Sequence, residues 1–262
     1  MTFEKMIVER DGPVGRMIFN NPERHNAVSR EMWEAVVAIM AGFATDPAVR
    51  VVVVGGAGGK AFVSGADISK FESERSSEDA VDRYNVATHA ATEALVNFAK
   101  PTVAMIDGYC IGGGMSIALA CDMRICSTGS EFGVPAAKLG LGYGADGVRR
   151  LMDVVGPAFT REIFYTGRRY SAEDAFAMGL VNRVVPKAEL GTQVTELVHS
   201  IADNAPMTVA SIKKIVGELV KDPADRDMAE CDRMVKACFA SQDYIEGRRA
   251  FMEKRKPVFV GR

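Results

Sequence analysis

The spacing of hydrophobic positions changes several times along the chain, and each change predicts a different element. The opening run MIVERDGPVGRMIFN has two β-rich segments around Asp11-Gly12, a pair typical of a hairpin turn. From Ser29, a favoured helix N-cap residue, apolar residues recur three and four positions apart. This spacing predicts a helix with Trp33, Val36, Val37, Met40 and Phe43 on one face.

Two similar units follow this helix. VRVVVVGG precedes GGKAFVSGADI, and KPTVAMIDG precedes GGGMSIALACDM, so each unit has an apolar strand, a glycine-rich turn and a helix start. A further strand, MRICST, precedes SEFGVPAAKLGLGYGADG, whose glycines and proline predict a shaped loop. Repeated strand, turn and helix units predict an α/β fold with its chemistry at the strand ends.

The chain after Gly156 has helical periodicity. We expect helices in TREIFYTG, in the capped SAEDAFAMGL, in PMTVASIKKIVGELVK, and in RDMAECDRMVKACFA running on into DYIEGRRAFMEKRKPVF. Because no low-complexity linker interrupts the sequence, we predict a core over residues 1–200 and a C-terminal helical subdomain over residues 201–262 packed against it.

Composition and charge exclude several classes of function. The 262 residues are 48% hydrophobic and 25% charged, with a formal net charge of -2, which gives no general attraction to nucleic acid or to an anionic membrane. The N-terminus lacks a signal-peptide pattern, and no apolar stretch is suited to a membrane span. We therefore expect a cytoplasmic protein with reduced thiols and no metal site, since no CxxC pair occurs among Cys110, Cys121, Cys126, Cys231 and Cys238.

The stretch GYCIGGGMSIALACD, residues 108–122, is the first candidate for chemistry. Glycines in a turn between a strand and a helix let a bound group approach backbone N–H donors, and the start of a helix favours negative charge. This stretch therefore predicts a place that can hold an oxyanion.

Five stretches together give a family resemblance that extends from about residue 3 to residue 260. PERHNAVS, GKAFVSGADI, DGYCIGGGMSIALACD, YTGRRYSAEDAFAMGLVNRVV and AFMEKRKPVF closely resemble the crotonase, or enoyl-CoA hydratase/isomerase, superfamily. The resemblance implies a crotonase-like spiral of ββα units with a C-terminal helical trimerisation subdomain, and a homotrimer or a dimer of trimers. It also implies an acyl-CoA thioester substrate whose carbonyl oxygen becomes an enolate, with coenzyme A present only as part of the substrate and no other cofactor.

The resemblance carries binding roles onto particular residues. The two backbone N–H groups of the family's oxyanion hole correspond to Ser64 and Gly113. Each aligned donor in a dry site is worth about 3 to 4 kcal/mol when charge develops on the oxygen. The same resemblance implies contacts to coenzyme A from Arg24, Ala61, Ala66, Asp67 and Ile68, and from Lys254 or Lys256, which can come from a neighbouring subunit.

The sequence departs from the hydratases of the family at both catalytic glutamates. Those enzymes use the two carboxylates to add water across a double bond. The corresponding positions here are Ser116, two residues after the glycine triplet, and Ala136, after Pro135. Alanine transfers no proton, so the sequence predicts a poor hydratase unless other residues perform this role.

Four polar residues are the candidates for that role. Tyr143 matches a tyrosine of methylmalonyl-CoA decarboxylases in the family, and His89 has the spacing of a histidine in 4-chlorobenzoyl-CoA dehalogenases. The nucleophilic aspartate of the dehalogenases aligns with Gly144, which argues against dehalogenation. Asp146 is either a base or a helix N-cap, and Ser116 is either a substrate contact or a bond to its own helix. A structural role for Tyr143 and His89 remains the alternative.

The sequence leaves several functions open. The first is an acyl-CoA enzyme that stabilises a thioester enolate, with decarboxylation, hydrolysis or another lyase reaction favoured over fast hydration. An ordinary enoyl-CoA hydratase or isomerase that uses other residues is the second, and a catalytically silent CoA-binding scaffold is the third. The sequence lacks the basic stripe that RNA binding would require. Apolar candidates for the acyl pocket are Met32, Phe71, Val134 and Leu139.

Overall fold

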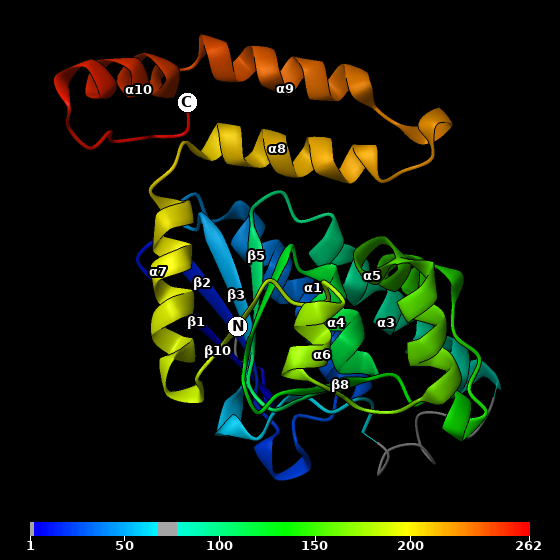
Figure 1. Ribbon diagram of the computed structural model, residues 1–262. Coiled ribbons are helices and arrows are strands. Elements are labelled where there is room, and N and C mark those ends of the chain that lie inside the picture. Colours follow the sequence, from blue (N-terminus) through cyan, green and yellow to red (C-terminus); the bar gives the residue numbers. More distant parts are fainter. Residues whose placement is uncertain (1–2, 68–77) are drawn as a thin grey trace.

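The computed structural model describes residues 3–67 and 78–262, which form two β-sheets with helices packed around them (Figure 1). Within these residues the larger sheet has six strands in the order β1 (Met6–Asp11), β2 (Val14–Phe19), β3 (Val51–Gly56), β5 (Thr102–Ile106), β7 (Met123–Ser127) and β10 (Arg183–Val185). The first two strands are antiparallel and form the predicted hairpin, and the others are parallel.

The smaller sheet collects the short strands that follow the long ones. Its order is β4 (Ala61–Val63), β6 (Tyr109–Ile111), β8 (Glu131–Gly133) and β9 (Tyr170–Ser171), with only the β8–β9 pair antiparallel. Three successive turns of the chain, beginning at β3, each give one strand to the larger sheet, one to the smaller sheet and then a helix. These helices are α3 (Glu78–Val96), α4 (Gly113–Ala120) and α5 (Ala145–Thr166). This arrangement confirms the predicted α/β spiral of ββα units.

Strand β3 is apolar on both faces because both of its faces are covered. Val51 and Val53 point toward α7 (Leu190–Ala202), whereas Val52 and Val54 belong to the core on the other side. That second core includes α1 (Arg30–Thr45), whose Trp33 is almost fully buried and donates from Nε1 to Tyr84 Oη over 3.0 Å. Met115 and Ile117 of α4 belong to the same core as Val52 and Val54, so α4 and α7 lie on opposite faces of the larger sheet.

Three boundaries differ from the sequence-based expectations. The stretch predicted as one loop contains β8, which pairs with β6 and β9, and a 3-10 turn at Ala136–Leu139. Helix α5 begins at Ala145, well before Gly156, which forms a break inside it with φ 75°. Near the C-terminus, the expected continuous helix is divided at Ser241, whose Oγ accepts the Tyr244 N–H and caps the second part. Local hydrogen bonding thus overrides the periodicity at this point.

The C-terminal helices gather at one end of the molecule (Figure 1). They are α8 (Pro206–Leu219), α9 (Met228–Ala240) and α10 (Gln242–Glu253), and an open, mainly apolar groove of about 840 Å³ lies among them. Residue 200 lies in the last turn of α7, and the division of the chain at this residue stays a prediction. None of the helices within residues 3–67 and 78–262 combines the length and apolarity needed to cross a membrane.

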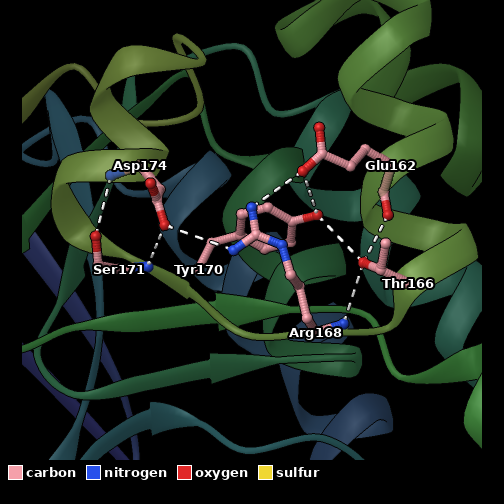
Figure 2. A network of polar contacts seen from close by, with 6 residues as sticks. All are labelled: Glu162, Thr166, Arg168, Tyr170, Ser171 and Asp174. Carbon is pink, nitrogen blue, oxygen red and sulfur yellow. Dashed lines mark hydrogen bonds and ion pairs between the residues drawn. The ribbon is translucent and has the colours of Figure 1, made fainter.

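A polar network fixes α6 (Ala172–Ala177) against the end of α5 (Figure 2). Arg168 binds Glu162 over 3.0 Å and lies over the Tyr170 ring at 3.9 Å. Ser171 and Asp174 form a capping box, which confirms the expected start of this helix. These groups bond mainly to one another, so the network supports the fold around β9.

Candidate active site

The glycine triplet places the start of α4 directly against the end of β4. Gly112 is the N-cap with φ 54°, in the left-handed region that favours glycine, and Gly113 is the first helical residue. A Cβ on Gly114 would lie 2.1 Å from Val63 O, so only glycine permits this approach. As a result, the Gly113 and Ser64 backbones, predicted to form the oxyanion hole, lie in neighbouring segments.

The two predicted donors have different local bonding. The Gly113 N–H belongs to the first turn of α4 and has no acceptor within its own helix. The Ser64 N–H donates to His25 O over 3.2 Å, at the long end of the usual range. An oxyanion at this place would share the Ser64 donor with the His25 carbonyl.

The carbonyl of His25 is held by an unusual turn. His25 and Asn26 have φ values of 52° and 55°, and Asn26 is fully buried. The Asn26 side chain donates to Ala57 O and Ala61 O over 2.9 and 2.8 Å, and its Oδ1 accepts the Asn21 N–H. The hydrogen bonds of Asn26 thus hold the turn at His25 and Asn26 against the start of β4.

Ser116 and Tyr143 form a direct hydroxyl pair beside the glycine triplet. Ser116 lies one helical turn after Gly113 on α4, and its Oγ is 2.9 Å from Tyr143 Oη. The Tyr143 ring contacts Phe164 edge to face, with centroids 4.8 Å apart. Burial raises the pKa of Tyr143, while the Ser116 bond and the Arg150 charge act in the opposite direction. The phenol is therefore a neutral proton donor near pH 7.

Two ion pairs join α3 to α5 next to this hydroxyl pair. His89 Nδ1 lies 3.8 Å from Asp146 Oδ2, and one turn further along Glu93 Oε1 binds Arg150. The first pair is open to solvent, with side chains 61% and 71% exposed, whereas the Arg150 side chain is only 20% exposed. Asp146 lies in the first turn of α5, and its side chain does not cap the helix, which has Gly144 as its N-cap.

The predicted contacts to coenzyme A fall into two groups. Arg24 lies 3.7 Å from the buried Asp67, and the Ala66 backbone bridges to Val28, so these residues surround the same turn as Ser64. Ala61 begins β4, and Ile68 lies outside the described residues. Lys254 ends α10, and Lys256 binds Asp203 over 2.5 Å beyond the end of α7, on the opposite face of the sheet from α4. The two lysines do not join the first group within one chain.

The apolar candidates are also divided. Met32 and Val134 are buried in the core, and Leu139 is 67% exposed beside the site loop. Phe71 lies outside the described residues. In the part of the chain that the structure describes, no group of three or more His, Cys, Asp or Glu side chains is arranged to hold a metal ion.

Glu93, Arg150 and Gly147 belong to this site and are not among the site residues predicted from the sequence. The signal was present in the spacing, because His89 and Glu93 on one helix, and Asp146 and Arg150 on another, are each four residues apart. Residues with that spacing share a helix face, but only the tertiary structure shows that the two faces meet.

Comparison with known proteins shows to which family the chain belongs. The profile of the family described as enoyl-CoA hydratase/isomerase matches residues 9–262. The chain belongs to the enoyl-CoA hydratase/isomerase family. It is 32% identical to crotonyl-CoA hydratase of Syntrophomonas wolfei, with 100% of both chains covered. It is 33% identical to carnitinyl-CoA dehydratase of Escherichia coli strain K12, with 99% of both covered.

Solved structures of the family have the same fold as this chain. An enoyl-CoA hydratase/isomerase family protein from Hyphomonas neptunium superposes with a TM-score of 0.94 at 35% identity, covering 98% of both chains. An enoyl-CoA hydratase/carnithine racemase from Magnetospirillum magneticum gives a TM-score of 0.92 at 31% identity, over 100% of this chain and 97% of that one. The expected crotonase fold is confirmed, and the chain is an acyl-CoA-transforming enzyme of this family.

Proposed function

We propose that this enzyme decarboxylates a malonyl-type acyl-CoA thioester and protonates the resulting enolate. The observation that supports this reaction is the Ser116–Tyr143 hydroxyl pair, with Oγ and Oη 2.9 Å apart, at a position where hydratases of the family carry a carboxylate. Decarboxylation requires an oxyanion site and a proton donor but no base to remove an α-proton. A neutral phenol beside the start of α4 provides such a donor.

The proposed reaction has two steps, loss of carbon dioxide and protonation of the enolate. The bond between the α-carbon and the carboxylate breaks, carbon dioxide leaves, and the bonding electrons form the enolate. The N–H groups of Gly113 and Ser64 stabilise the enolate oxygen, which would compete with His25 O for the Ser64 donor. Tyr143 then gives its proton to the α-carbon, and water restores the phenol proton through Ser116. The reaction requires no cofactor, and it consumes only the CoA thioester and one proton from water.

Hydration of an enoyl-CoA, or the reverse dehydration, is the second candidate. It is favoured by the names of relatives that are 32–33% identical and by the solvent-exposed His89–Asp146 pair, which could activate water. Ala136, at the second glutamate position, is buried and carries no acid or base, and this weakens the candidate. A silent CoA-binding scaffold is the third reading.

A substrate panel with two matched variants tests these candidates. Malonyl-CoA, methylmalonyl-CoA and crotonyl-CoA are incubated with the enzyme, and carbon dioxide, free thiol and the enoyl absorbance are followed separately. We expect decarboxylation to fall about 10² to 10⁴-fold in Tyr143→Phe. It should stay unchanged in Tyr165→Phe, which alters a tyrosine that is 76% exposed.

The outcomes separate the three readings. Rapid hydration of crotonyl-CoA that survives Tyr143→Phe and is lost in Asp146→Asn would replace our proposal by a hydratase. Binding of thioesters without turnover of any of them would indicate a scaffold. Release of free thiol as the main signal would indicate hydrolysis.

We also propose that the enzyme is a homotrimer or a dimer of trimers built through its C-terminal helices. The open groove among α8, α9 and α10 and the strongly exposed Phe251 and Met252 support this assembly. Lys254 and Lys256 would then serve the CoA site of a neighbouring copy. Light scattering should give three or six times 28.3 kDa, and a stable monomer would contradict the proposal.

A further inference from the structure

The position of the Tyr143 ring depends on a glycine in the first turn of α5. A Cβ on Gly147 would lie 2.6 Å from Tyr143 Cε1 and 3.2 Å from Cδ1, so any side chain there would displace the ring. Gly147 has helical backbone angles and needs no left-handed freedom. Glycine within a helix is less stable than alanine by about 0.5–1 kcal/mol, so close contact with the ring is the benefit it provides.

Two ion pairs join α5 to α3 close to Gly147 in the sequence of α5. Asp146, next to Gly147, pairs with His89, and Arg150, one turn after Asp146, pairs with Glu93. Two uncharged residues also contact Tyr143: Ser116 from α4 bonds to its hydroxyl, and Phe164 from α5 packs against its ring. The Arg150 charge lowers the pKa of Tyr143, against the larger effect of burial, and Arg150 pairs directly with Glu93.

We propose that Gly147 and the Arg150–Glu93 ion pair are positioning residues for Tyr143: Gly147 fixes where the ring lies, and the ion pair sets the charge that the phenol faces. The inference rests on the proposed function for its catalytic meaning, because Tyr143 is the proton donor there. The position of the ring and the charge that the phenol faces can be measured without any substrate. Neither Gly147 nor the ion pair needs to touch the substrate.

Opposite shifts of the phenol titration are the first test. Arg150→Gln removes the cation and leaves Glu93 unpaired, so the Tyr143 pKa should rise. Glu93→Gln leaves Arg150 unneutralised, so the pKa should fall, each by roughly one unit. Loss of packing alone would not give shifts of opposite sign. Arg149→Gln is the matched control, because Arg149 is the neighbouring residue but pairs with Asp153 and Asp222.

The titration is measured directly on the phenol. Difluorotyrosine at position 143 lowers the intrinsic pKa, which brings the titration into a range where the protein is folded, and fluorine NMR follows this one residue. Circular dichroism at each pH confirms folding. Equal titration curves in the Arg150→Gln and Glu93→Gln proteins would overturn the role of the ion pair.

A double-mutant cycle tests Gly147. Gly147→Ala should lower kcat by at least about tenfold in the wild-type background with little change in KM, because the phenol moves away from Ser116. In the Tyr143→Phe background the same change should have no further effect on kcat, since the group that Gly147 positions is already absent. Equal losses in both backgrounds would overturn the role of Gly147.

Failure of this inference can be distinguished from failure of the proposed function. If the phenol titrates as expected but the enzyme decarboxylates no thioester, the positioning of Tyr143 stands and the reaction must be revised. If decarboxylation depends on Tyr143 but the titration is the same in all variants, the positioning is wrong and the reaction stands.

Discussion

Replacing Gly114 by alanine should inactivate the enzyme through the geometry of its oxyanion site. The added Cβ would be 2.1 Å from Val63 O, 3.0 Å from Val63 C and 3.1 Å from Val63 Cβ. Ordinary contacts of a Cβ are at 3.4–4 Å, so the start of α4 and the end of β4 must separate by more than an ångström. The obstacle is backbone, which cannot rotate aside as a side chain can.

The kinetic consequence follows from the neighbours of Gly114. The preceding residue is Gly113 and the residue after Val63 is Ser64, so the separation moves the two proposed oxyanion donors apart. Loss of one aligned donor lowers kcat by about 10² to 10³-fold. Overpacking should also destabilise the fold by about 1–3 kcal/mol, partly offset by the higher helix propensity of alanine.

The assay is kcat and KM on the thioester that the substrate panel identifies, together with urea denaturation. Gly42→Ala is the matched control, because Gly42 lies in α1 and a Cβ there meets nothing within 4 Å. We expect Gly42→Ala to keep full activity and gain up to about 1 kcal/mol of stability. The reasoning is refuted if Gly114→Ala has the kinetics and stability of this control.

Three further predictions concern stability and thiol chemistry. Glu218 is almost fully buried, and hydrogen bonds from Lys214, Lys221 and the Asp227 N–H lower its pKa from 4.5 to about 2. The contribution of its carboxylate to stability is therefore complete above pH 4.5 and is lost as the pH falls toward 2. The difference in thermal midpoint between wild type and Glu218→Gln should therefore be largest near neutral pH and shrink below pH 4.5, and a pH-independent difference would be the contrary result. Arg124 is buried and donates hydrogen bonds to Leu180 O, Cys121 O and Ala118 O. Arg124→Met should therefore lower the free energy of unfolding by about 2–4 kcal/mol, measured by urea denaturation. A loss of less than about 1 kcal/mol would contradict this prediction. Burial raises the pKa of both Cys121 and Cys126 to about 12. After iodoacetamide treatment of the native enzyme at mildly alkaline pH, mass spectrometry should therefore find both thiols unmodified. Early modification of either thiol would contradict this prediction.

Local signals in the sequence were sufficient for many elements. The hairpin at Asp11-Gly12, the helix after Ser29 and the capping box at Ser171 each depend on residues close together in the chain, and all three occur in the structure. Ser29 occupies the N-cap position without a side-chain bond to the helix, so its place is confirmed but not the expected contact. Strand β8 was missed because a three-residue strand is stabilised by partners distant in sequence.

The candidate site was predicted only in part. Motif order pointed to Ser64 and Gly113, and the structure brings their segments together through the contact between Gly114 and Val63. It also joins Tyr143 to Ser116 and His89 to Asp146. Pairing between side chains on different helices depends on how the helices pack against each other. The spacing of residues along the sequence does not reveal that packing.

The sequence by itself determined the α/β class, the family and the absence of glutamate at positions 116 and 136, because these are properties of residue identity and local order. Only the tertiary structure decided that the Ser64 N–H already has an acceptor, that Gly147 makes room for the Tyr143 ring, and that Glu93 neutralises Arg150 beside it. The physical reason is that hydrogen bonds, close packing and charge pairing act over a few ångströms, and the packing of α3, α4 and α5 sets which residues lie within that range.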